Sequence, residues 1–145
     1  MAGDTIIFDA VDDIICAIKS DWKVGPTLRI EPVWEVKTVG FGSSRQEVIY
    51  VTPLTEQIKP FDLFGKAYWQ ELPIKLDVRT YRNIKRHTDV VKELHRIIKN
   101  IIRRSNEGFL QVVLKSSEPA NTEIRNMFRQ VITLHYISVE TFTFT

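Results

Sequence analysis

Residues 72–104 read LPIKLDVRTYRNIKRHTDVVKELHRIIKNIIRR, and this stretch decides the fold. In its first part apolar and polar residues alternate, with Ile74, Leu76 and Val78 on one side and Lys75, Asp77 and Arg79 on the other. Alternation with a period of two is typical of a strand that has one buried face. We therefore expect a strand from Tyr68 to Tyr81.

The second part of this stretch has helical spacing. Its apolar residues share one helical face: Val90, Val91, Leu94, Ile97, Ile98, Ile101 and Ile102. The opposite face carries Lys92, Glu93, His95, Arg96, Lys99, Asn100, Arg103 and Arg104. The pattern predicts a helix from about Thr88 to Ser105, ended by Gly108, a residue that tolerates the geometry of helix ends.

The chain has 145 residues, 43% of them hydrophobic and 26% charged, which is typical of a single globular domain covering 1–145. The net charge of +2 is too small to require a nucleic-acid partner. Cations are nevertheless concentrated in one region: Arg79, Arg82, Lys85, Arg86, Lys92, Arg96, Lys99, Arg103 and Arg104. They form either a solvated helix face or a surface that meets phosphate or an acidic protein.

Cys16 is the only cysteine, so an intramolecular disulfide is excluded. Its apolar sequence neighbours favour a buried, inert thiol. No run of about 18 apolar residues predicts a membrane span. The first residues lack the basic group that opens a secretory signal, so we expect synthesis in the interior of a cell.

Upstream of the deciding stretch, the pattern predicts a helix from Ile6 to Trp22, with aspartates near its start that favour the helix dipole. Strands are expected over 28–39 and 46–52, joined as a hairpin by the loop 40–44. The segment 53–66 contains two prolines yet is rich in large apolar side chains. It either folds back on the core or forms an arm that is buried against another chain.

Downstream, we expect a strand over 109–115, a polar loop over 116–126 and a long strand from Phe128 to about Thr143. The long strand carries apolar residues on both faces, which indicates cover on both sides. The element order is then α-β-β-β-α-β-β. It predicts an α+β domain with a mixed or antiparallel sheet of about five strands and two helices on one face.

No sequence motif predicts a catalytic or metal site. His87, His95 and His135 lie in different settings, and zinc-ligand spacing, phosphate loops and a nucleophile elbow are absent from the sequence. The triplet Glu35-Val36-Lys37 is similar to the acid-x-Lys of magnesium nucleases. It falls on the first expected strand rather than the next, so a nuclease is the weaker interpretation. A non-specific nucleic-acid binder is the other alternative, although only Tyr81 interleaves with the cations.

In order and size the chain resembles the tail terminator (tail-completion) proteins of tailed viruses and prophages. The resemblance rests on the strand 72–80 leading into a basic helix, on Gly108 opening the next strand, and on the charged turn and strand of 125–134. The longer apolar arm at 53–66 departs from that family.

This resemblance implies a virion protein without a reaction or a cofactor. It would form a ring, expected to be a hexamer, that caps the tail tube and meets neck or head-completion proteins around passing double-stranded DNA. Expected interface residues are Leu54, Ile58, Phe61, Leu63, Phe64, Tyr136, Phe142 and Phe144. Charges expected to face the lumen or DNA are Arg79, Arg82, Lys85, Arg86, Arg96 and Lys99.

Overall fold

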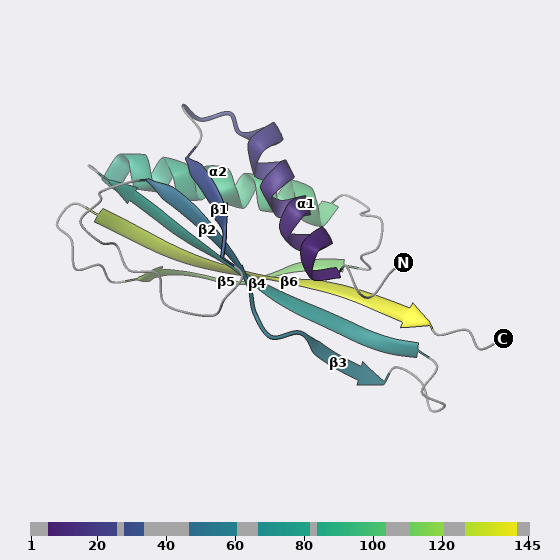
Figure 1. Ribbon diagram of the computed structural model, residues 1–145. Helices are drawn as coiled ribbons and strands as arrows, with labels where there is room; N and C mark the ends of the chain where they lie inside the picture. The colour runs from purple at the N-terminus through teal and green to yellow at the C-terminus, as the bar shows by residue number, and fades with distance from the viewer. Residues whose placement is uncertain are drawn as a thin grey trace.

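Two helices cover one face of a six-stranded mixed sheet (Figure 1). The computed structural model describes residues 6–25, 28–33, 47–60, 67–81, 84–103, 111–120 and 127–141. The helices are α1 (Ile6–Asp21) and α2 (Ile84–Arg103), and the strands are β1 (Arg29–Pro32), β2 (Val48–Pro53), β3 (Gln57–Pro60), β4 (Ala67–Tyr81), β5 (Gln111–Ala120) and β6 (Met127–Thr141). The α+β class is confirmed, but the order is α-β-β-β-β-α-β-β because β3 forms within the segment 53–66.

The strands lie in the order β1-β2-β4-β6-β5, and β3 pairs with β4 beside this path. β4 and β6 are antiparallel along their whole lengths, from Ala67 opposite Thr141 to Tyr81 opposite Met127. The expected hairpin of the first two strands is wrong, because β1 and β2 run parallel. Glycines in the connection indicate a turn, but they do not encode the direction in which the next strand pairs. The loop 40–44 itself lies outside the described residues.

The alternation in β4 is confirmed by burial. Leu72, Ile74, Leu76 and Val78 are all fully buried and face the helices. On β6 the same face carries Ile132, Leu134 and Tyr136, also fully buried. Apolar side chains of α1, α2 and β2 complete this core, and their removal from water is the main stabilising contribution to the fold.

β3 continues the path of β2 along the same edge of β4. Pro53 lies opposite Ile74 and Gln57 lies opposite Glu71, so the outer strand contains an extra residue between these points. This is the geometry of a β-bulge. The amide of Leu54 donates to the carbonyl oxygen of Pro73 at 2.8 Å within it. Residues 57–60 therefore fold back onto their own sheet, whereas 61–66 lie outside the described residues.

Several expected boundaries and positions are corrected. α2 begins at Ile84 rather than Thr88. Residues 84–87 do not belong to the apolar stripe from which the helix was predicted, but residues of these types are tolerated in a helix. β5 extends to Ala120 through the expected polar loop, with a bulge between Leu114 and Ser116. The thiol of Cys16 is exposed, because the residues that flank it in sequence lie on other faces of α1.

Candidate interaction surfaces

One end of the sheet extends beyond the two helices. Figure 1 shows β3, the start of β4 and the end of β6 reaching past α1 and α2. All four side chains of β3 are exposed, and Ile58 retains 57% of its accessible surface. An exposed strand that carries a large apolar side chain is a typical place for contact with another chain.

A groove of about 580 Å³ crosses this end of the sheet on the face opposite the helices. Residues from β3, β4, β5 and β6 line it: Lys59, Pro60, Trp69, Glu71, Gln111, Val113, Lys115 and Ile137. Nδ1 of His135 lies 2.6 Å from Oε1 of Glu71. This hydrogen bond lowers the pKa of Glu71, although partial burial acts against it, and Trp69 adds a second hydrogen bond. The groove lining thus combines apolar side chains, among them Trp69, Val113 and Ile137, with charged groups of both signs.

The outer face of α2 carries a row of cations. Lys85, Lys92 and Lys99 are exposed and recur every seventh residue, which places them about 10.5 Å apart along the helix. Within the described part of the chain, no ion pair engages them. The flanking Ile84 and Ile102 are 59% and 41% exposed, although Ile102 was expected on the buried face. Ile102 lies about 100° around the helix from the buried Ile101, at the border of the apolar stripe, so its side chain is left in solvent.

Arg96 lies beside this row but has a structural role. Its Nε donates to Oε1 of Glu93 at 2.7 Å, and its Nη2 donates to the carbonyl oxygen of Asp21 at the end of α1. Glu93, expected on the polar face, is only 4% exposed and also accepts a hydrogen bond from the amide of Lys23. The hydrogen bond from Arg96 lowers the pKa of Glu93 in spite of partial burial. The pair thus holds the end of α1 on α2.

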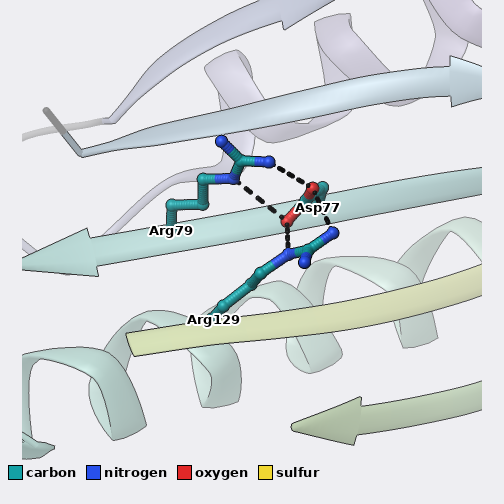
Figure 2. A network of polar contacts seen from close by, with 3 residues as sticks. All are labelled: Asp77, Arg79 and Arg129. Atoms are coloured by element: carbon teal, nitrogen blue, oxygen red, sulfur yellow. Dashed lines mark hydrogen bonds and ion pairs between the residues drawn. The ribbon is translucent and has the colours of Figure 1, made fainter. Parts of the chain in front are cut away.

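Asp77 lies between two arginines on the face away from the helices, as Figure 2 shows. Arg129 donates to both carboxylate oxygens at 2.8 and 2.9 Å, and Nη2 of Arg79 donates to Oδ2 at 3.0 Å. The guanidinium of Arg79 also stacks over the ring of Tyr50, 5.0 Å from its centroid. Burial raises the pKa of Asp77, but the hydrogen bonds and charges of the two arginines outweigh it and the pKa is lowered.

This network corrects the expectation for Arg79. Its side chain is 2% exposed and paired, so it cannot reach a DNA phosphate from this position. Tyr136 needs the same correction as an expected interface residue. It is fully buried in the core, and its hydroxyl donates to Oδ2 of Asp13 at 2.8 Å.

The remaining expected residues divide into two groups. Ile58, Lys85 and Lys99 are exposed, Leu54 and Arg96 are partly buried, and Arg86 is partly buried beside Glu47 at 3.5 Å. Phe61, Leu63, Phe64, Arg82, Phe142 and Phe144 lie outside the described residues. The groove was not anticipated from the sequence, because its lining comes from four strands and becomes one surface only through the pairing of β3 with β4.

Within the described ranges, no cluster of three or more histidine, cysteine, aspartate or glutamate side chains could hold a metal ion. The triplet at 35–37 lies outside those ranges. No helix among the described residues has the length and apolar character needed to span a membrane.

Comparisons with known proteins show the fold of this chain. No protein-family model matches it, and no curated protein matches it. Among solved structures, it is similar to a chain in the virion of a native gene transfer agent (GTA) particle, with a TM-score of 0.56. The alignment covers 86% of this chain and 90% of the other at 11% sequence identity. The two chains therefore share one α+β fold over nearly their whole lengths.

Proposed function

We propose that this chain is a structural protein of a phage-like virion and acts as a tail terminator. A ring of six copies closes the head-proximal end of the tail tube and joins it to the neck. The observation that carries the proposal is the shared fold with a component of a GTA virion, which covers most of both chains. It agrees in class with the family resemblance drawn from the strand 72–80 and the helix that follows it.

The projecting end of the sheet supplies the contact surface in this proposal. Ile58 is exposed there, and Leu54 lies at the bulge that leads to it. Phe61, Leu63, Phe64, Phe142 and Phe144 are proposed to join this surface on the basis of the sequence alone. Its partners are neighbouring copies, the tail tube protein and neck or head-completion proteins. Tyr136 is left out because it is a core residue.

The basic face of α2 supplies the second surface. Lys85 and Lys99 are proposed to face the lumen, together with Arg82, Arg86 and the part of Arg96 that remains exposed. Cations in a channel hold the phosphates of passing double-stranded DNA in a sequence-independent manner. Arg79 is left out because it is buried. The protein needs no reaction and no cofactor for this role, and it is made in the host cell before joining the virion.

An assembly experiment tests the proposal. The purified protein is added to a tail tube protein from the same genome, and tube length and protein mass are followed by electron microscopy and native mass spectrometry. A terminator stops tube growth and adds a ring to one end of each tube. Tubes of unchanged length and a chain that stays monomeric would contradict it. Salt-dependent DNA binding by such a monomer would instead favour a nucleic-acid-binding protein.

A further inference from the structure

We propose that neighbouring copies join by extending the sheet, with the outer edge of β3 in one copy pairing with the first residues of β5 in the next. This inference rests on the proposed ring and names the contact that builds it. It assigns the ring contact to two four-residue segments, Gln57–Pro60 and Gln111–Leu114.

Both segments lie at edges of the described sheet. β3 pairs with β4 alone, and β5 pairs with β6 alone, among the strands that the structure describes. The backbone groups on the outer side of each strand therefore have no strand partner in this part of the chain. Such edges readily accept a strand from another chain, and main-chain hydrogen bonds then supply much of the affinity.

The strand directions suit this contact. β3 is antiparallel to β4, β4 to β6, and β6 to β5. β3 and β5 therefore run in opposite directions. A second copy placed at the end of the same sheet sets its β5 antiparallel to β3 of the first, which is slightly the more stable type of pairing.

The two segments also match in length and in the face of the sheet on which their apolar side chains lie. β3 spans Gln57–Pro60, and the regular part of β5 ends at Leu114, where the bulge begins. Ile58 lies opposite Gln70 on β4 and therefore shares the helix-side face with Leu72. Val112 and Leu114 lie on that face as well, opposite Tyr136 and Leu134. A pairing that keeps the faces aligned sets the exposed Ile58 opposite Val112 or Leu114.

The rest of β5 disfavours a longer contact. The bulge after Leu114 interrupts its ladder, and Pro119 cannot donate a backbone hydrogen bond.

The contact also joins two different edges, so it is heterologous, and a heterologous contact closes into a ring when the rotation between copies allows it. Since a four-residue pairing is short, closure of the ring adds the stability that one contact lacks.

Disulfide cross-linking tests this pairing. If Ile58 pairs with Val112, Lys59 lies opposite Gln111 on the groove side of the sheet. If Ile58 pairs with Leu114, Lys59 lies opposite Val113. The variants are Lys59→Cys/Gln111→Cys and Lys59→Cys/Val113→Cys, each with Cys16→Ser to remove the exposed native thiol. Within one copy β3 and β5 are separated by β4 and β6, about 14 Å across the sheet, which is too far for an intramolecular disulfide.

The expected result is a ladder of covalent oligomers on mild oxidation, up to the size of the ring, from at least one of the two double variants. The matched control, Lys59→Cys/Lys19→Cys with the same Cys16→Ser change, places its second thiol on the exposed side of α1 and should give no ladder. Covalent dimers from Lys59→Cys alone would show that two β3 edges meet symmetrically and would overturn the proposal.

Failure of the edge pairing and failure of the proposed function are distinguishable. A ring that caps tubes without forming a ladder in either double variant overturns the edge pairing and leaves the terminator role intact. A ladder from a protein that never caps a tube supports the pairing and overturns that role. No ladder and no ring overturns both.

Discussion

The hydroxyl of Tyr136 donates a hydrogen bond to Oδ2 of Asp13 at 2.8 Å and so joins the last strand of the sheet to the first helix. The tyrosine ring is fully buried between them. The final strand and the opening helix are therefore held together by a polar contact as well as by the apolar core.

Tyr136→Phe should lower the free energy of unfolding by about 1–2 kcal/mol, because the ring still fills its site but the carboxylate loses a charge-assisted hydrogen bond. Urea denaturation measures this change. Asp13→Asn should also destabilise the protein, whereas Asp12→Asn, which alters an exposed residue one position earlier, should change stability by less than about 0.5 kcal/mol. Equal effects of the two asparagine variants would contradict the role given to this contact.

Asp77→Asn should be among the most destabilising single substitutions in the sheet. It removes the charge between Arg79 and Arg129, and breaking a buried ion pair costs about 3–5 kcal/mol. The control is Glu31→Gln, which breaks an exposed ion pair with Arg29 and should cost less than about 1 kcal/mol.

The acid side of the stability curve tests the same network. The pKa of Asp77 is lower in the folded protein than in the unfolded chain, so its contribution to stability is present above about pH 4 and is lost as the pH falls through the folded pKa. Asp77→Asn should therefore flatten the acid limb of a plot of unfolding free energy against pH. An unchanged acid limb would contradict the account.

His87 should give the protein a second pH dependence of stability. Burial lowers the pKa of His87, whose Nδ1 lies 2.8 Å from the hydroxyl of Thr80. The unfolded chain binds this proton more readily, so stability should be complete above about pH 6.5 and fall as the pH drops through the folded pKa. His87→Asn should reduce the loss of stability between about pH 8 and pH 5 in thermal unfolding. At about pH 8 the imidazole is neutral, so the difference from wild type there serves as the baseline.

The cations of α2 can be tested separately from the fold. Lys85→Gln/Lys92→Gln/Lys99→Gln should weaken binding to double-stranded DNA, with a salt-dependence slope reduced by about 0.9 for each lost phosphate contact. The control, Lys19→Gln/Lys23→Gln/Arg29→Gln, removes the same charge from exposed sites outside α2 and outside the proposed subunit contact. Equal losses would show that net charge, not this face, binds DNA.

Arg96→Gln should behave differently from Lys99→Gln. It takes donors away from Glu93 and from the end of α1, so it should destabilise the protein. Lys99→Gln should leave the unfolding free energy nearly unchanged, because within the described chain no ion pair holds Lys99.

The sequence predicted the elements whose burial follows a local period. β4 and α2 are examples, because Leu72–Val78 and Val90–Ile101 show in sequence which face is covered. β3 was not predicted, because its four residues are too short a run to show a period, end in Pro60, and become a strand only by continuing β2 across a bulge. The parallel direction of β1 was missed for the same reason, since it depends on a tertiary pairing.

The predictions for the candidate surfaces were likewise right for some residues and wrong for others. Ile58, Lys85 and Lys99 were expected to be accessible, and their side chains are exposed. Arg79 and Tyr136 were misjudged, because Arg79 lies in a buried network with Asp77 and the distant Arg129, whereas the partner of Tyr136, Asp13, is 123 positions away. A period in the sequence shows that a residue faces inward or outward, but only the fold shows which polar group it meets.

Cryo-electron microscopy of particles that carry a tagged copy of this protein tests the central claim most directly. The account predicts density for a ring of this α+β fold at the junction of tail tube and neck, once per particle, with the basic face of α2 toward the channel. Density elsewhere in the particle, or particles that lack the protein yet have joined tails of uniform length, would contradict it.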